Sequence, residues 1–225
     1  MDRPDPRRVG SYAAKRLLDI VISAIALAFL SPLFLVVALG IKLDSRGPVF
    51  FRGVRVGKDR RPFRIFKFRS MVVGADAQGR HSTSTDDVRI TRFGRIVRRF
   101  NLDELAQLIN VVWGDMSIVG PRPEVPYYVD LFTEEEKQVL LSVRPGITDF
   151  ATLWIRDEGA RLAGKDDPEA AYLQEIWPEK HRLQRHYVES QSMLVDFKIM
   201  LLTLKSHLFD RFKSQHLLPK LPPVD

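Results

Sequence analysis

The chain has 225 residues, enough for one domain with a substantial core or for two small ones, and its hydrophobic content of 45% is ordinary. It contains no cysteine, which excludes a disulfide scaffold, thiolate catalysis and cysteine-ligated zinc. The formal charge is +7 in total, but residues 1–100 carry +13 and residues 101–225 carry −6. The basic first half predicts an anionic partner, which could be nucleic acid, phospholipid headgroups or a diphosphate.

Residues 17–41 form an apolar segment with a single charge, Asp19. As one straight helix the segment would be about 37 Å long, enough to cross a hydrocarbon core of about 30 Å. Ser31-Pro32 lies near its middle. Because proline lacks an N–H and clashes with the preceding turn, we expect the helix to kink or break there. The Ser31 hydroxyl would then bond a freed carbonyl or cap a second helix, and each half would be too short to span.

Basic residues stand on both sides of this segment. The positive-inside rule keeps basic flanks in the cytoplasm, so both ends are expected on that side. A re-entrant membrane helix-break-helix satisfies this expectation better than a spanning anchor. We therefore divide the chain into a membrane hairpin with its basic flank, residues 1–46, and a cytoplasmic domain on the membrane interface, residues 47–225. The flanking cations are Arg3, Arg7, Arg8, Lys15 and Arg16 before the segment, and Lys42, Arg46, Arg52, Arg55, Lys58, Arg60 and Arg61 after it.

The remaining sequence predicts a small β-hairpin followed by helices, so the fold class expected is α/β but mostly α. Residues 48–71 alternate as two strands around a turn at 58–61, and residues 72–88 are expected to form a loop. Residues 115–126 are too rich in glycine and proline for regular structure. Helices are predicted at 92–99, at 102–113 with Gly114 as the stop, and at 133–142, 167–177, 178–190 and 192–212. The last of these is amphipathic and suits a membrane interface or a packed core.

Asn101-Leu102-Asp103-Glu104 begins the most strongly periodic helix and has two interpretations. In one, Asn101 caps the helix and Glu104 completes a capping box. In the other, the carboxylates belong to a phosphate site, because cations and helix N–H groups that hold a carboxylate ionised also bind phosphate. The neighbouring arginines are Arg95, Arg98, Arg99 and Arg122.

Asp103 and Glu104 would leave a helix about 100° apart, so we expect them to have different roles. One could attack phosphorus to form an acyl phosphate, while the other handles a proton or helps to hold magnesium. The metal would bridge the oxygens of a diphosphate and neutralise the leaving nucleotide.

Further motifs follow one another along the chain: residues 15–19 (KRLLD), Ser31-Pro32, 47–51 (GPVFF), 66–71 (FKFRSM), 103–110 (DELAQLIN), 114–123 (GDMSIVGPRP), 144–148 (RPGIT) and 196–199 (DFKI). With these motifs the chain resembles, from about Lys15 to Thr203, the monotopic phosphoglycosyl transferases that begin bacterial glycoconjugate assembly. Its length matches the members that consist of the catalytic domain alone.

The resemblance implies a ping-pong reaction. Asp103 would be the nucleophile that takes sugar phosphate from a UDP-sugar and releases UMP, with polyprenyl (undecaprenyl) phosphate as the acceptor. Glu104 would assist with a proton or with the Mg²⁺ cofactor, while Arg98 and Arg122, and also Lys67, would grip phosphate or nucleotide. The resemblance also implies the cytoplasmic face of the bacterial inner membrane, and a homodimer is compatible with it.

The sequence departs from the family pattern at Asp149-Phe150-Ala151-Thr152, where Gly-Trp/Leu-Ala-Gln is frequent. Residues 155–177 resemble an insertion, which we expect to help select the sugar. Two other functions would each explain part of the sequence. A membrane-anchored scaffold would reduce Asp103 and Glu104 to capping residues. A nucleic-acid-binding protein would explain the pI of about 9.8, but no aromatic-basic or helix-turn-helix pattern occurs, so we expect no nucleic-acid partner.

Overall fold

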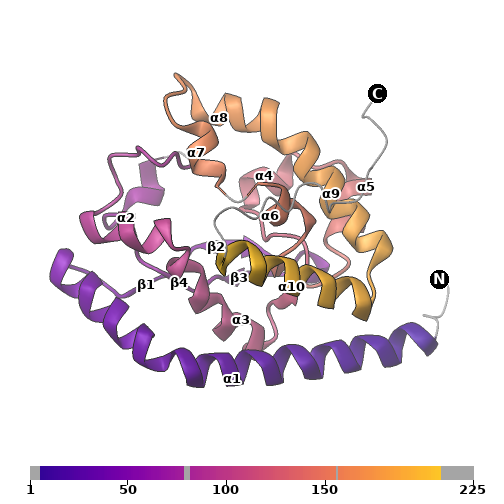
Figure 1. Ribbon diagram of the computed structural model, residues 1–225. Coiled ribbons are helices and arrows are strands. Elements are labelled where there is room, and N and C mark those ends of the chain that lie inside the picture. The colour runs from indigo at the N-terminus through magenta and orange to yellow at the C-terminus, as the bar shows by residue number, and fades with distance from the viewer. Residues whose placement is uncertain (1–5, 79–81, 156, 209–225) are drawn as a thin grey trace.

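The apolar segment lies within one long helix, α1 (Pro6–Asp44), which continues through Pro32. The computed structural model describes residues 6–78, 82–155 and 157–208. Figure 1 shows that α1 is bent but does not turn back on itself. The Ser31 hydroxyl donates a hydrogen bond of 2.8 Å to the carbonyl of Ala28, the group that the missing N–H of Pro32 leaves free. The expected compensation by Ser31 is confirmed. The expected break is wrong, because one freed carbonyl, once bonded, lets the helix bend and continue.

One side of α1 packs against the rest of the protein, and polar contacts hold it near both of its ends. Lys15 Nζ lies 2.6 Å from a carboxylate oxygen of Asp196, and Asp19 accepts a hydrogen bond of 2.7 Å from the hydroxyl of Ser117. Near the other end, the backbone N–H of Phe93 donates to Asp44 at 3.1 Å. Arg3 and the side chains of Arg7 and Arg8 lie outside the described residues.

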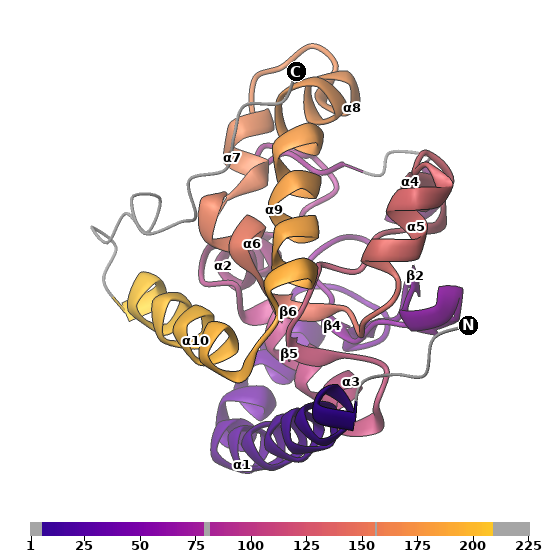
Figure 2. The same cartoon turned by 90° about the vertical axis from the view of Figure 1, so that its right-hand side faces the viewer.

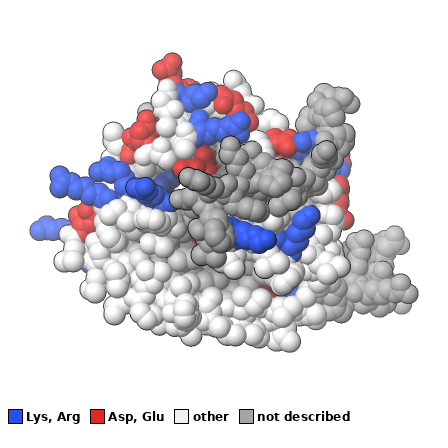
Figure 3. All heavy atoms as spheres, viewed as in Figure 1, with Lys and Arg blue, Asp and Glu red and all other residues white. Residues whose placement is uncertain are grey.

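The opposite side of α1 exposes large apolar side chains, and Figure 3 shows this underside as a surface almost without charge. The stretch Tyr12–Asp44 is long and apolar enough to cross a membrane. Such a surface is unusual unless something apolar covers it. The exposed side chains are those of Leu17, Leu18, Val21, Ile22, Ile25, Phe29, Leu35, Val36, Leu39 and Leu43.

The predicted β-hairpin is confirmed as two short antiparallel pairs. β2 (Val54–Val56) pairs with β3 (Pro62–Arg64), and β1 (Phe50–Phe51) pairs with β4 (Lys67–Phe68). A short 3₁₀ turn, η1 (Lys58–Arg60), joins the strands β2 and β3. The ring of Phe68 meets that of Phe34 from α1 edge-on at 5.0 Å, so this hairpin packs against α1.

Residues 115–126 contain a strand that the sequence analysis did not predict. β5 (Ser117–Val119) pairs in parallel with β6 (Gly146–Thr148). The two chains approach so closely that a Cβ on Gly146 would lie 2.1 Å from the backbone nitrogen of Gly120. Gly120, which argued against regular structure, is therefore one of the two glycines that permit the pairing.

Helix α2 (Arg92–Arg99) has the predicted bounds, but its apolar side chains are only partly buried. Val97 is buried, whereas Ile96 and Phe100 are 51% and 61% exposed. The predicted helix at 102–113 consists of a 3₁₀ turn, η3 (Leu102–Gln107), and an α-helix, α3 (Leu108–Trp113). Gly114, with a φ of 103°, ends α3 as predicted.

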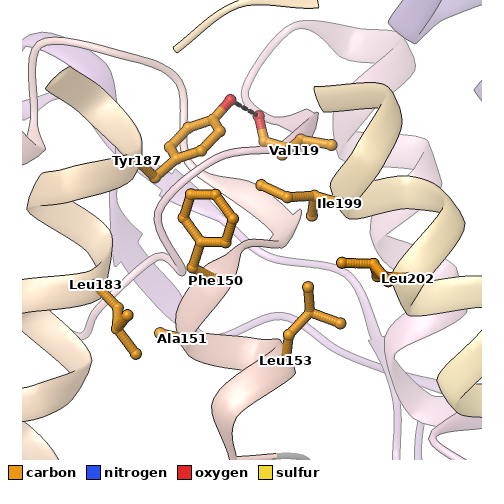
Figure 4. Packing of buried hydrophobic residues seen from close by; sticks show 8 residues of the cluster. All are labelled: Val119, Phe150, Ala151, Leu153, Leu183, Tyr187, Ile199 and Leu202. Carbon is orange, nitrogen blue, oxygen red and sulfur yellow. Dashed lines mark hydrogen bonds between the residues drawn. The ribbon is translucent and has the colours of Figure 1, made fainter. Parts of the chain in front are cut away.

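The rest of the chain forms helices above α1, with α9 (Trp177–Ser190) rising through the middle of the body (Figure 2). The predicted helices are present with shifted bounds, and residues 209–212 of the last one lie outside the described residues. The side chains in Figure 4 form a core between α6, α9, α10 and β5, where the hydroxyl of Tyr187 donates to the carbonyl of Val119 at 3.0 Å. These elements, with the 3₁₀ turn η2 and the π-helical η4, are η2 (Ala75–Gln78), α4 (Pro126–Asp130), α5 (Glu134–Leu140), α6 (Phe150–Trp154), α7 (Glu158–Leu162), α8 (Pro168–Ala171), η4 (Tyr172–Ile176), α9 (Trp177–Ser190) and α10 (Met193–Leu208).

Candidate active site

Asp103 and Glu104 lie in the first turn of η3. This turn begins directly after Asn101, a residue in the left-handed conformation. Asn101 has a φ of 52°, and its side chain makes no capping hydrogen bond. The side chain of Glu104 points to cations instead of the helix start. The capping-box interpretation is therefore wrong, and the left-handed residue turns the chain so that two adjacent carboxylates face a basic site.

Glu104 is held between two cations that come from distant parts of the sequence. One of its carboxylate oxygens accepts a hydrogen bond of 2.8 Å from Lys67 Nζ in β4. Arg122, in the turn between β5 and α4, donates to both oxygens of the same carboxylate, once at 2.9 Å through Nη1 and once through Nη2. Although burial opposes ionisation, Arg122 and Lys67 hold the pKa of Glu104 well below its usual range. Glu104 is thus a permanent negative charge that fixes both cations.

Asp103 differs from its neighbour in having no such partner. Its side chain is buried, and among the described residues none donates a hydrogen bond to its carboxylate. Burial raises the pKa of Asp103, and the charge of Glu104 adds to this rise. The nearby cations Lys67, Arg98 and Arg122 oppose the rise. The result is a desolvated carboxylate that the protein leaves available beside fixed positive charge.

The five predicted site residues are brought together by the fold. Arg98, half-buried in α2, acts on Asp103 through its charge rather than through a hydrogen bond. Arg55 of β2 also lies at the site, although the sequence did not predict it there. Its charge is coupled to Glu104, Arg122 and Glu124, and burial lowers its pKa. A charged residue between two valines in a predicted strand was the only signal for it.

The site offers one free carboxylate for a magnesium ion. Both oxygens of Glu104 are already engaged by Lys67 and Arg122, so Glu104 does not fit as a metal ligand in this arrangement. Across the described residues, no group of three or more acidic or histidine side chains could hold a metal by itself. Magnesium commonly binds one or two carboxylates together with substrate phosphates. Asp103 with a bound diphosphate fits that pattern.

Comparison with known proteins identifies the family. The model of the bacterial sugar transferase family matches residues 10–210. The chain belongs to the bacterial sugar transferases.

The chain is similar to several transferases whose names specify different sugars. It is 41% identical to an undecaprenyl-phosphate glucose phosphotransferase of Komagataeibacter xylinus, over 88% of this chain and 36% of that protein. It is 46% identical to an N-acetylgalactosaminephosphotransferase of Aeromonas hydrophila, over 61% of this chain and 33% of that protein. That protein is named for UDP-N-acetylgalactosamine and undecaprenyl phosphate. A UDP-glucose:undecaprenyl-phosphate glucose-1-phosphate transferase of Caulobacter vibrioides is 37% identical, over 88% of this chain and 71% of that protein. The chain thus spans about a third of the length of the first two relatives.

Within this sugar transferase, the motif DELAQLIN does more than supply carboxylates. The buried side chain of Asn110 accepts a hydrogen bond of 2.7 Å from the N–H of Phe66 and donates one of 2.9 Å to the carbonyl of Arg64. These bonds tie α3 to the segment that carries Lys67. The asparagine therefore fixes the distance between Lys67 and Glu104, which lie on separate elements.

A second buried ion cluster lies behind the turn that carries Arg122. Lys180 of α9 is 3% exposed and lies 2.9 Å from Glu124 and 3.1 Å from Glu158. Its ammonium group also donates to the hydroxyl of Tyr172 at 2.8 Å. Glu158 and Tyr172 both belong to the segment 155–177. That segment is therefore tied to the Arg122 turn.

Proposed function

We propose that the protein is a phosphoglycosyl transferase that moves a sugar phosphate from a UDP-sugar to polyprenyl phosphate, releasing UMP. The observation that supports this best is the pair of adjacent carboxylates with opposite environments. Glu104 is locked between Lys67 and Arg122, whereas Asp103 is buried and free beside them. A free carboxylate next to fixed cations suits attack on a phosphorus atom, because the cations hold the phosphate oxygens and stabilise developing charge. The names of the relatives point to the same reaction.

The reaction would proceed in two displacements. In the first, an oxygen of Asp103 forms a bond to the phosphorus that carries the sugar, the bond to the bridging oxygen breaks, and its electron pair leaves with UMP. In the second, an oxygen of polyprenyl phosphate attacks the same phosphorus. The bond to Asp103 then breaks, which regenerates the carboxylate and releases polyprenyl diphosphate-sugar.

The other site residues hold the phosphates in place. Lys67 and Arg122 are positioned by Glu104, and Arg98 adds positive charge on the side of α2. A carboxylate with a strongly lowered pKa is a poor base, so we assign Glu104 to positioning rather than to proton transfer. Bound Mg²⁺, held by Asp103 and the diphosphate, would neutralise charge on the diphosphate and on the leaving UMP.

We further propose that α1 enters one leaflet of the cytoplasmic membrane and that both of its ends lie on the cytoplasmic side. Contacts at Lys15 and at Asp44 tie the two ends to the same body, and the exposed side of α1 between them is apolar. A span would draw this body into the bilayer. Single cysteines placed at Arg8 and Lys58 test the topology, since the chain has none of its own. With an impermeant thiol reagent, both should react only after spheroplasts are lysed, and labelling of Arg8→Cys in intact cells would show a span.

The product would serve as the first membrane intermediate of a bacterial glycoconjugate such as an O-antigen, a capsule, an exopolysaccharide or a glycoprotein glycan. The relatives are named for glucose and for N-acetylgalactosamine, so the sugar has to be found by experiment. We propose that residues 155–177 help to select it. Glu158 reaches the Arg122 turn through Lys180.

Release of UMP from a panel of UDP-sugars, with polyprenyl phosphate present, tests the proposed function directly. We expect one or a few UDP-sugars to be consumed by the purified protein in a lipid nanodisc. With the donor alone, the intact mass should rise by that of one sugar phosphate, and the addition should map to Asp103. Absence of UMP release with every donor in the presence and absence of Mg²⁺ would refute the assignment and leave a membrane-anchored scaffold as the alternative.

A further inference from the structure

Helix α2 has an exposed face that the site described above does not use. Arg92, Arg95 and Arg99 are exposed there together with Ile96 and Phe100. In the part of the chain that the structure describes, these arginines form none of the ion pairs, although Arg99 lies near the ring of Phe100. These three arginines lie beside two exposed apolar side chains, which suits a partner that is both anionic and apolar.

The orientation of this face is fixed by close packing on the other side of α2. A Cβ on Gly94 would lie 2.0 Å from the carbonyl oxygen of Ser70, so the backbone of α2 packs directly against the segment that follows β4. The ring of Phe93 fills the space above Gly40 of α1, and the N–H of Phe93 bonds to Asp44. The helix cannot rotate without losing these contacts, so the arginines stay turned outward.

The arginines of α2 are arranged around the helix from its exposed face toward Asp103. At 100° per residue, Arg92, Arg95 and Arg99 fall within an arc of about 60°. Arg98 lies about 60° beyond Arg95, and it already acts on Asp103. Figure 3 shows basic side chains gathered over α2, directly above the uncharged underside that α1 forms. This face therefore lies between the membrane helix and the catalytic turn.

We propose that the exposed face of α2 binds the acceptor lipid: its arginines hold the phosphate of polyprenyl phosphate, and Ile96 and Phe100 contact the first isoprenoid units. Arginine binds phosphate oxygens through two N–H groups at once, which suits a terminal phosphate at the membrane surface. A soluble UDP-sugar has no apolar chain that would match the two exposed side chains. This proposal rests on the proposed function, because it names the entry site for the second substrate.

The half-reactions separate the two proposals. The triple variant Arg92→Gln/Arg95→Gln/Arg99→Gln is placed in nanodiscs of phosphatidylcholine, with the UDP-sugar that the wild type consumes. UMP formed in the first turnover, with the donor alone, should match the wild type within about twofold. The amount of this UMP also measures how much of the variant is folded. The KM for polyprenyl phosphate should rise about tenfold or more, since charge-assisted contacts to phosphate are lost. The KM for the UDP-sugar should not change.

Two control variants sharpen the result. Lys58→Gln/Arg60→Gln/Arg185→Gln removes the same charge from exposed positions elsewhere and should leave both half-reactions unchanged. Replacement of the α2 arginines by lysine should restore part of the acceptor affinity. An unchanged acceptor KM overturns the proposal and leaves the function standing, whereas absence of UMP release by the wild type removes both. An effect seen only in nanodiscs that contain anionic phospholipid also overturns it, because the face would then bind bulk lipid.

Discussion

Two ion clusters, one partly buried and one with a fully buried cation, lie on either side of the turn that carries Arg122, and they have opposite composition. In one, the carboxylate of Glu104 lies between the cations Lys67 and Arg122. In the other, the cation Lys180 lies between the carboxylates Glu124 and Glu158. The first has an excess of positive charge and the second an excess of negative charge.

The difference separates a binding site from a structural tie. Buried charge is costly unless it is paired, so an unbalanced cluster needs a further partner. The positive cluster stands beside Asp103 and Arg98, where an anionic diphosphate would complete it. In the negative cluster, the hydroxyl oxygen of Tyr172 accepts a further hydrogen bond from Lys180, and the cluster holds the segment 155–177 against the Arg122 turn. Each of the following predictions tests one side of this comparison.

The largest effect is expected from Asp103→Asn. Loss of the nucleophile should reduce UMP release roughly a thousandfold or more, as removal of a covalent catalyst does in other enzymes. The covalent sugar-phosphate adduct should disappear from the intact mass. An Asp103→Asn protein that turns over at nearly the wild-type rate would contradict the assignment. Glu104→Gln is the matched control, since it alters the neighbouring carboxylate and should still form some adduct.

Lys180→Met should cost stability instead of chemistry. It leaves the largely buried Glu124 and the partly exposed Glu158 without their cation, and loss of one partner of a fully buried pair typically destabilises a protein by about 3–5 kcal/mol, which is the upper bound here. Thermal unfolding in nanodiscs measures the loss. The triple variant Glu124→Gln/Lys180→Met/Glu158→Gln should recover much of it, because no charge is then left unpaired. If Lys180→Met unfolds like the wild type and yet releases no UMP, the negative cluster belongs to the active site and the comparison fails.

Arg122→Ala and Arg98→Ala should each reduce kcat/KM for the UDP-sugar by about 2–4 kcal/mol, or roughly thirty- to a thousandfold. Arg122 should have the larger effect because it also positions Glu104. Inhibition by UMP should weaken in parallel, since the same cations bind its phosphate. Unchanged kinetics and unchanged UMP inhibition in both variants would show that these arginines are only structural charges.

The pH dependence should reveal the raised pKa of Asp103. Its ionised form attacks phosphorus, so kcat/KM for the UDP-sugar should fall as pH is lowered, with a midpoint above the ordinary range for an aspartate. Glu104 stays ionised throughout because its pKa is lowered. An acid limb at or below the ordinary aspartate pKa, about 3.9, would contradict the burial argument.

The smallest effect concerns stability and follows from the same pKa. A carboxyl group whose pKa is higher in the folded state favours folding when protonated, and this contribution is lost as pH rises through the folded pKa. Asp103→Asn should therefore be more stable than the wild type at neutral pH. The difference in unfolding temperature should vanish below the unfolded pKa of the aspartate. A variant that is less stable at neutral pH would mean that the charge of Asp103 is compensated.

Much of the local structure was determined by the sequence itself. The bounds of α2, the end of α3 at Gly114 and the hairpin at 48–71 follow from capping, glycine conformation and alternation, which act within a few residues. The residue types of the site were also readable, because carboxylates and arginines close together in sequence indicate phosphate chemistry. The homodimer, the magnesium ion and the topology of α1 remain predictions.

Only the tertiary structure decided how the two carboxylates differ. A capping box and an ion cluster have the same local sequence, and the choice depends on Lys67 and Arg122, which approach Glu104 from other elements. The pairing of β5 with β6 and the cluster around Lys180 likewise join residues far apart in the chain. The course of α1 through Pro32 depends on one hydroxyl and on the contacts that hold its two ends. Local propensity cannot encode such contacts, because their free energy exists only once the distant partners have met.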